Sequence, residues 1–371
     1  MLVTNIFFLA NSWLSKPERM VAFDRFFTEK EKTKLLTYRK ISLKLLSQAK
    51  IIVVDNKKAD GCLGDSIRDS RLVGVVNDIC PNKIVLHWST FPEIFGKHPF
   101  ITQVKRQDEK IIFSYQKTQD TDTLRIEADP KQVVKIIPRY CGVCPAMPFT
   151  KDCGKGILLP QVPLHEVQRL QVVWEITYGA RNLDCLPPPS IKISEGNLFK
   201  SRQTFIQLPV VKNESLNIII HPDAHNNHFR EKRWATKKWT ELIKVLTQRD
   251  PKIKIFLTTG ANHPQLSEEI NTNCQKQNLP LCLLPQMNFV QYVGLLTLFP
   301  KTNTVFVGLE SMAASHLAPG IGLRSVVIAS DKVFDPLIYG PFGGIVVMSN
   351  DHQTKSVSVQ KDFEAIHLLI S

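Results

Sequence analysis

The segment from Val307 to Ala318 contains residue types that could bind an anion. An apolar strand is expected to end at Val307, and small residues lead from it directly into a helix. Backbone N–H groups at such a helix start, together with the helix dipole, favour a phosphate. Ser311 and His316 could donate to that phosphate, and Glu310 could accept hydrogen bonds from sugar hydroxyls. The alternative is a tightly packed helix start with a capping serine and a buried histidine.

A second candidate segment begins at His221, directly after a strand expected at 216–220. Basic residues follow it closely, namely Arg230, Lys232 and Arg233. Cationic side chains beyond the carboxyl end of a strand suit a diphosphate. The alternative interpretation is a basic loop that is simply solvated.

A single carboxylate, Asp65, follows the first apolar strand of the chain, at the point where a helix begins. A carboxylate at a strand–helix junction is well placed to act as a general base. It is equally well placed to cap the helix N-terminus. The nearby Gly61 and Gly64 do not have the spacing of a dinucleotide-binding loop, so a nicotinamide site is excluded.

A cysteine-containing loop is a weak candidate for a structural zinc or iron site. Cys141 and Cys144 form a tight pair, with Cys153 further along and Cys185 or a histidine as the fourth ligand. No second tight pair accompanies them. The alternative is a set of thiols without a ligand.

Strands that alternate with helices along most of the chain indicate parallel, doubly wound sheets. The wholly apolar run 51–54 is typical of a buried parallel strand, and a hairpin near 111–126 is expected at the edge of its sheet. Residues 196–215 are expected to connect the two halves. In the second half we expect strands at 216–220, 253–258, 303–307, 325–329 and 345–348, with helices at 236–248, 264–275, 289–299 and 311–319 between them.

This pattern predicts an α/β protein with two doubly wound, Rossmann-like domains that face each other across a cleft. Ligands of open α/β sheets bind beyond the carboxyl ends of the strands, so the cleft is the expected site. The expected divisions are a basic helical extension at 1–48, an N-terminal domain at 49–205 and a C-terminal domain at 206–371. The extension packs on the body of the protein or, alternatively, contacts a membrane surface or another subunit.

Composition limits the class of protein and the kind of partner. The chain has 371 residues, of which 43% are apolar and 22% charged, as in a folded globular protein. A net charge of +13 favours an anionic partner. No patterned nucleic-acid module, Walker loop or nucleophile elbow is present. We expect no nucleic-acid partner, no membrane-spanning helix and a cytoplasmic, reducing location.

Taken in order, these segments resemble the lipopolysaccharide heptosyltransferases of glycosyltransferase family 9. The resemblance begins with the first strand and Gly64-Asp65, and it continues through the block from His221-Pro222 to Lys232-Arg233-Trp234. It also includes the helix expected from His165 with the proline-rich run after it, at Leu186 to Pro189. The remaining motifs are Thr258-Thr259-Gly260, Leu284-Pro285-Gln286-Met287, Glu310 to Ala318 and Tyr339-Gly340-Pro341.

The resemblance implies a GT-B fold and the transfer of heptose from ADP-heptose, with inversion, to an anionic, lipid-linked glycan. It implies an acceptor-binding N-terminal domain and a C-terminal domain that binds the nucleotide sugar. No cofactor is required, because cationic side chains and a helix dipole can supply the positive charge. It also implies peripheral contact with the inner membrane. The implied roles are base for Asp65, diphosphate neutralisation for Lys232, adenine contact for Met287, sugar or ribose contact for Glu310, and donor binding for His221, Gly260, Ser311, Met312, Ala313 and His316.

This sequence departs from the family pattern in the 310–316 block. The acidic residue of the family stands five positions before the histidine, where this chain has Ser311, and Glu310 comes one position earlier. Met312 stands where the family has a glycine. The alternatives to a heptosyltransferase are a transferase that uses another nucleotide sugar, a nucleotide-sugar epimerase on the same fold, and a non-catalytic protein that only binds its ligand.

Overall fold

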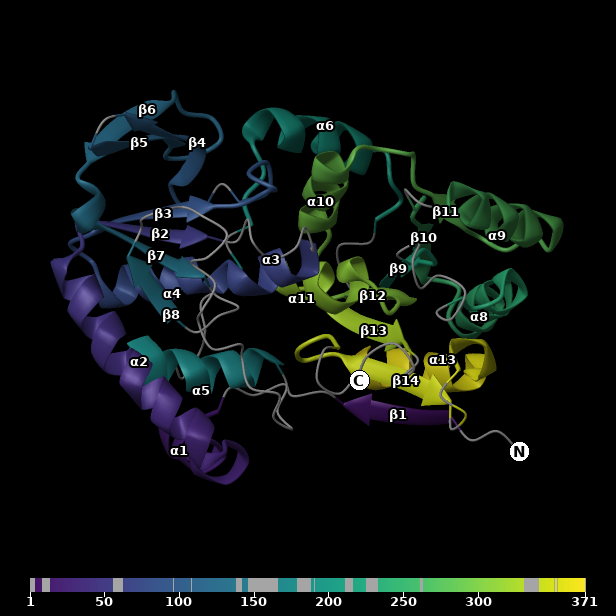
Figure 1. Ribbon diagram of the computed structural model, residues 1–371. Helices are drawn as coiled ribbons and strands as arrows, with labels where there is room; N and C mark the ends of the chain where they lie inside the picture. The colour runs from purple at the N-terminus through teal and green to yellow at the C-terminus, as the bar shows by residue number, and fades with distance from the viewer. Residues whose placement is uncertain are drawn as a thin grey trace. The chain divides into compact units, whose positions relative to one another are not determined.

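The computed structural model describes residues 4–8, 14–55, 63–95, 97–107, 109–137, 142–145, 166–178, 188–189, 191–210, 216–224, 233–260, 263–329, 340–349, 351 and 353–370 (Figure 1). The chain divides into two compact units. One consists of residues 13–195, and the other combines residues 1–12 with residues 196–371. Each unit contains one seven-stranded sheet with helices packed on it. The expected α/β class with two Rossmann-like sheets is therefore confirmed.

The C-terminal unit, residues 1–12 with 196–371, has the strand order of a dinucleotide-type fold. From one edge to the other its strands run β1-β14-β13-β12-β9-β10-β11, and every neighbouring pair is parallel except β1 with β14. The order reverses between β9 and β12, which is where a doubly wound sheet binds its ligand. The strands are β1 (Thr4–Phe8), β9 (Asn217–His221), β10 (Lys254–Leu257), β11 (Cys282–Leu283), β12 (Thr304–Leu309), β13 (Arg324–Ile328) and β14 (Ile345–Ser349).

Apolar side chains of one helix face anchor this sheet. Trp239, Leu242, Ile243 and Leu246 recur at helical spacing on α8 and pack with the buried β9, β12 and β13 side chains in one cluster. The Trp234 ring packs edge-on against Trp239, with 4.7 Å between ring centroids. The helices are α6 (Glu195–Phe205), α8 (Thr236–Arg249), α9 (Pro264–Lys276), α10 (Phe289–Leu298), the π-helical turn η4 (Ala313–Leu317), α11 (Ala318–Gly320) and α13 (Val359–Ile370).

The N-terminal unit, residues 13–195, is a mixed sheet in the order β6-β5-β4-β3-β2-β7-β8. Its parallel centre contains β4, β3, β2 and β7, and antiparallel strands complete both edges. The strands are β2 (Ile51–Asp55), β3 (Ile84–Trp88), β4 (Phe100–Gln107), β5 (Lys110–Gln116), β6 (Leu124–Ala128), β7 (Val133–Ile137) and β8 (Gly142–Pro145). The helices are α1 (Lys16–Phe26), α2 (Glu29–Gln48), α3 (Leu63–Asp69), α4 (Arg71–Ile79) and α5 (Glu166–Tyr178).

The observed division of the chain differs from the expected one at both ends. The expected extension 1–48 is split, because β1 joins the sheet of the C-terminal unit through β14, whereas α1 and α2 pack on α5 of the N-terminal unit. The boundary lies at 195/196 rather than 205/206, because α6 packs with the C-terminal unit. One such contact is the hydrogen bond from Ser201 Oγ to the Gln291 carbonyl oxygen, at 2.9 Å.

The metal site and the membrane-spanning helix are the two remaining features considered from the sequence. Cys141, Cys153 and Cys185, together with the side chain of Cys144, lie outside the described residues, so the metal-site hypothesis stays untested. Among the residues that are described, no three His, Cys, Asp or Glu side chains gather as they would around a metal ion. Nor is any helix in the described ranges both long and apolar enough to cross a bilayer.

Candidate donor-binding site

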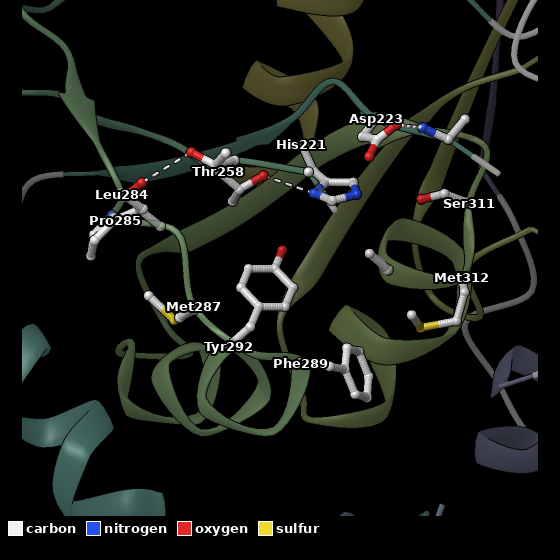
Figure 2. A pocket seen from close by; sticks show the side chains of 14 residues that line it. His221, Asp223, Thr258, Leu284, Pro285, Met287, Phe289, Tyr292, Ser311 and Met312 are labelled. Atoms are coloured by element: carbon white, nitrogen blue, oxygen red, sulfur yellow. Dashed lines mark hydrogen bonds between the residues drawn. The ribbon is translucent and has the colours of Figure 1, made fainter. Parts of the chain in front are cut away.

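A pocket of about 230 Å³ opens in the C-terminal unit where the strand order reverses (Figure 2). The loops after β9 and β10 and the turn after β12 supply its polar side, and the segment leading into α10 supplies most of its apolar side. Its lining consists of His221, Asp223, Ala224, Thr258, Thr259, Gly260, Leu284, Pro285, Met287, Phe289, Tyr292, Ser311, Met312 and Ala313.

His221 stands at the end of the central strand β9 and is held as a neutral ring. Its Nδ1 lies 2.7 Å from the hydroxyl oxygen of Thr258, at the end of the neighbouring strand. Burial lowers the pKa of His221 to about 4, although Asp223 opposes this shift. A neutral imidazole offers one donor and one acceptor. His221 can therefore make a directional hydrogen bond in the pocket, but it does not supply a positive charge near pH 7.

Tyr292 reaches the same region from α10, with its hydroxyl directed toward His221 and Thr258 (Figure 2). The His221 and Tyr292 rings are tilted by 31° with centroids 6.1 Å apart. Burial raises the pKa of the Tyr292 hydroxyl, so it stays protonated and can donate a hydrogen bond. The Asn288 side chain caps α10 by accepting a hydrogen bond from the Gln291 amide at 2.9 Å, which fixes the start of the helix that carries Tyr292.

Asp223 is a buried carboxylate held by contacts that surround it. One oxygen accepts from the Ala224 amide at 2.8 Å and lies 2.7 Å from His263 Nδ1, and the other accepts from the His263 amide at 3.3 Å. Gly260 makes this arrangement possible, because a Cβ at that position would lie 2.1 Å from an Asp223 oxygen. The glycine is therefore required by the close approach of the loops after β9 and β10.

The turn after β12 brings backbone and small side chains to the pocket. The Ser311 hydroxyl accepts from the Ala314 amide at 3.4 Å, which is the capping role considered as an alternative. The helix then widens into the π-helical turn η4, in which the Ala318 amide bonds to the carbonyl oxygen of Ala313, five residues earlier. A π turn accommodates one more residue than an α turn. The extra position between Glu310 and His316 thus has a physical place in the helix.

The predicted donor-site residues divide into three groups. His221, Gly260, Met287, Ser311, Met312 and Ala313 line the pocket together. Glu310 and His316 are not among the lining residues: Glu310 is buried, with its amide bonded to the Ile328 carbonyl oxygen at 3.0 Å, and His316 lies within η4. Their role as donor contacts stays a prediction. Lys232 and the side chain of Asp65 lie outside what the structure describes, although the Asp65 backbone belongs to α3.

Sequence reasoning assigned no role to five side chains of the pocket and its border, namely Thr258, Phe289, Tyr292, Asp223 and His263. Thr258 carried a signal, because it follows directly on a strand that neighbours the one ending at His221. The other side chains depend on how α10 and the loop before α9 pack on the sheet, which no local pattern reveals.

A known protein family matches the part of the chain that contains the pocket. The model of glycosyltransferase family 9 (heptosyltransferase) matches residues 163–332, which include every residue that lines the pocket. Residues 163–332 are therefore similar to glycosyltransferase family 9. The resemblance inferred from the motifs is confirmed, and with it the class of enzyme, a glycosyltransferase.

A solved structure shows the same fold. A family 9 glycosyltransferase from Veillonella parvula DSM 2008 is 12% identical, with a TM-score of 0.61 over 86% of this chain and 97% of that one. An ADP-heptose lipopolysaccharide heptosyltransferase II from E. coli is 15% identical over 86% of this chain and 98% of its own, with a TM-score of 0.47. At 12% identity the first likeness establishes the fold alone. No curated protein matches the chain.

Proposed function

We propose that the protein transfers heptose from ADP-heptose, with inversion, to an anionic glycan of the lipopolysaccharide-core type. The observation that carries this proposal is the pocket at the point where the strand order reverses. It combines hydrogen-bonding groups from the ends of β9 and β10 with an apolar wall of Leu284, Pro285, Met287 and Phe289. An apolar wall beside a few directional polar groups suits a planar base of a nucleotide.

The groups around Ser311, Met312 and Ala313 support a diphosphate at the other side of the pocket. They follow a buried strand and lead directly into a helix, where exposed amides favour an anion. In our proposal Lys232 adds a positive charge to the leaving diphosphate. Glu310 and His316, which the resemblance implies as donor contacts, belong to the same turn and the π-helical segment after it, and their contact with the donor remains part of the proposal.

In the proposed reaction Asp65 is the general base. An acceptor hydroxyl oxygen attacks the anomeric carbon and forms the new glycosidic bond, while the bond from that carbon to the diphosphate oxygen breaks. The hydroxyl proton passes to the Asp65 carboxylate, and ADP leaves with the bonding electron pair. The position of Asp65 in the fold supports its role as base. Asp65 belongs to α3, which follows β2, and the strand order of the N-terminal sheet reverses between β2 and β7.

The decisive experiment compares Asp65→Ala with Asp78→Ala, which removes an exposed carboxylate of α4. Loss of a general base lowers kcat by about 10²–10⁴-fold, whereas ADP affinity measured by calorimetry stays unchanged. Asp78→Ala retains both. Near-normal turnover of the Asp65 variant would remove this residue from the mechanism.

A second candidate function is ligand binding without transfer, or transfer from a different nucleotide sugar. The observation that favours it is Met312, whose side chain lines the pocket where the family pattern has a glycine. A thermal-shift screen across ADP-, UDP- and GDP-sugars separates these cases. Stabilisation by ADP-heptose without turnover on any glycan acceptor supports the binding protein, and stabilisation by another nucleotide sugar alone replaces the donor.

A further inference from the structure

We infer that the Tyr292 hydroxyl, together with His221 and Thr258, recognises the ribose hydroxyls of the nucleotide that binds in the C-terminal unit. Tyr292 is then a specificity-determining residue of the pocket, although it belongs to none of the motifs that resemble the family. This role rests on the proposed function, because it requires a nucleotide in the pocket. It does not depend on which base that nucleotide carries.

The order of the strands matches the order of the parts of a nucleotide. The sheet runs β12-β9-β10-β11 across the point where the strand order reverses. The turn at 311–313, on the diphosphate side, follows β12, and the apolar wall at 284–287, on the base side, follows β11. His221 ends β9 and Thr258 follows β10, so both lie between these two sides. The ribose joins the base to the diphosphate and therefore comes to the same place.

Tyr292 brings a hydroxyl to this middle part of the pocket from α10. Figure 2 shows its side chain between Met287 and Met312, with the hydroxyl directed toward His221 and Thr258. The hydroxyl oxygen is buried and has no hydrogen bond of good geometry with a described residue, although its approach to Thr258 opposes the rise of its pKa on burial. A buried hydroxyl without a partner is costly, and a ligand atom that bonds to it removes that cost.

His221 and Thr258 form a fixed pair beside the Tyr292 hydroxyl. His221 Nδ1 lies 2.7 Å from the Thr258 hydroxyl oxygen. The imidazole is flanked by the rings of Tyr292 and Phe306, whose centroids lie 6.1 and 6.0 Å from its own. The other ring nitrogen, Nε2, makes no hydrogen bond within the described part of the chain. His221 therefore holds one ring nitrogen in a defined position for a ligand.

The chemistry of these three groups favours a sugar hydroxyl over a phosphate. All three are uncharged near pH 7, because burial lowers the pKa of His221 to about 4 and raises the pKa of Tyr292. Phosphates are bound by cations or by several backbone amides, whereas a hydroxyl both donates and accepts. A hydroxyl can therefore bond to Tyr292 and to either tautomer of His221. A ribose supplies two such hydroxyls on neighbouring carbons.

The experiment measures the binding of ADP, 2′-deoxy-ADP and 3′-deoxy-ADP to the full-length protein by calorimetry. The test variant, Tyr292→Phe, removes one oxygen and keeps the ring that packs beside His221. The matched control, Tyr115→Phe, removes the same atom from β5 of the N-terminal unit. Two further variants, Thr258→Val and Thr258→Ser, remove and keep the hydroxyl that holds His221. The melting temperature of each variant is measured without nucleotide.

The wild type and Tyr115→Phe should bind ADP about tenfold more tightly than at least one deoxy analogue, because that analogue leaves the buried Tyr292 hydroxyl without a partner. Tyr292→Phe should lose about tenfold in ADP affinity and bind ADP and that analogue equally, with a melting temperature no lower than that of the wild type. A hydroxyl that only supports the fold would instead lower the melting temperature and leave the ratio of the two affinities unchanged. Thr258→Val should weaken ADP binding, and Thr258→Ser should restore it.

Equal affinity of the wild type for all three nucleotides would overturn the role of Tyr292 and leave the proposed function intact. Discrimination that persists unchanged in Tyr292→Phe would do the same, since another side chain would then contact the ribose. Absence of any nucleotide binding by the wild type would overturn the proposed function and the role of Tyr292 together.

Discussion

At the scale of single residues, the candidate site depends on Gly260, which has no side chain. Gly260→Ala places a Cβ 2.1–2.5 Å from three atoms of Asp223, a buried side chain that cannot move without losing its His263 contact. We expect the Asp223 loop to shift, at a cost of about 1–3 kcal/mol in stability, and ADP affinity measured by calorimetry to fall at least tenfold.

Gly196→Ala is the control for this substitution. Its added Cβ meets no atom within 4 Å, and it lies in the first turn of α6, where alanine is the better helix former. It should leave ADP affinity unchanged and raise the melting temperature slightly. If both variants bind ADP as the wild type does, the close approach of Asp223 to residue 260 is irrelevant to the pocket.

Another prediction concerns Asp362, a completely buried carboxylate of α13. Neither of its side-chain oxygens has a hydrogen-bond partner among the described residues, and burial raises its pKa to about 8. In the unfolded chain the group ionises near pH 4, so the folded state alone retains the proton between about pH 4 and pH 8. Stability from this group is therefore present below pH 4 and is lost as pH rises toward 8.

Asp362→Leu should remove that dependence. We expect the variant to melt at a higher temperature than the wild type at pH 8, and the difference to disappear near pH 4.5. Glu364→Gln, on the exposed side of the same helix, should change neither value appreciably. A variant that is less stable than the wild type at pH 8 would show that the Asp362 carboxylate has a stabilising partner.

How much of the site the sequence could predict depends on what a local pattern encodes. Strand ends and glycines were visible in the chain, so His221, Gly260 and the 311–313 turn were placed correctly around one pocket. The spacing of the 310–316 block could not show that residues 313–317 form a π turn, nor that Glu310 does not line this pocket. Tyr292 and His263 come from helices whose approach to the sheet depends on distant packing.

At the scale of elements, the alternation of apolar strands and amphipathic helices predicted β9, β10, β12, β13 and β14 within about two residues. The same reasoning missed β1 and β4. Residues 100–107 are largely polar after Ile101, and they form a strand because β5 provides an antiparallel partner with a buried face. The strand therefore depends on pairing rather than on its own apolar content.

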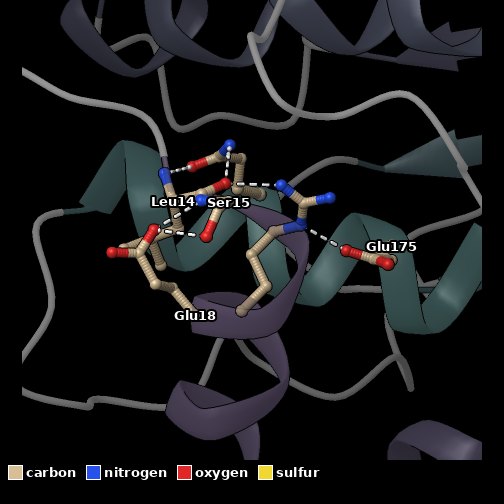
Figure 3. A network of polar contacts seen from close by, with 6 residues as sticks. Leu14, Ser15, Glu18 and Glu175 are labelled. Atoms are coloured by element: carbon tan, nitrogen blue, oxygen red, sulfur yellow. Dashed lines mark hydrogen bonds and ion pairs between the residues drawn. The ribbon is translucent and has the colours of Figure 1, made fainter.

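The attachment of α1 to α5 by the buried ion pair between Arg19 and Glu175 (Figure 3) leads to a prediction about buried charge. Removing one partner of a buried ion pair leaves the other uncompensated, which costs about 3–5 kcal/mol. We expect Glu175→Leu to increase hydrogen exchange across α1 strongly, because the Arg19 guanidinium then lacks its carboxylate. Arg19→Met combined with Glu175→Leu should recover most of the protection, since an apolar pair fills the same space. A double variant that exchanges as fast as the single one would mean that the charge itself is required.

At the scale of the whole molecule, strand β1 near the N-terminus completes the sheet of the C-terminal unit. Residues 4–8 pair antiparallel with β14, so the first strand of the chain covers what would otherwise be the edge of the C-terminal sheet. Without β1, the edge strand would be β14, Ile345-Val346-Val347-Met348-Ser349, which is short and apolar. An exposed edge of this kind readily pairs with another chain. The first strand thus protects a unit to which the next 183 residues, 13–195, do not belong.

Deletion of residues 1–12 tests this arrangement. We expect amide hydrogens of β14 to lose their protection from exchange, whereas those of β9, at the centre of the sheet, keep theirs. The shortened protein should also aggregate at concentrations where the full chain stays dispersed, because β14 then presents unpaired backbone groups. ADP binding should be largely retained, because the pocket lies at the ends of β9, β10 and β12, and β13 separates these strands from β14 and β1 in the sheet. Unchanged exchange in β14 after the deletion would contradict the pairing of β1 with β14. Residues 1–12 would then be part of the extension expected from the sequence.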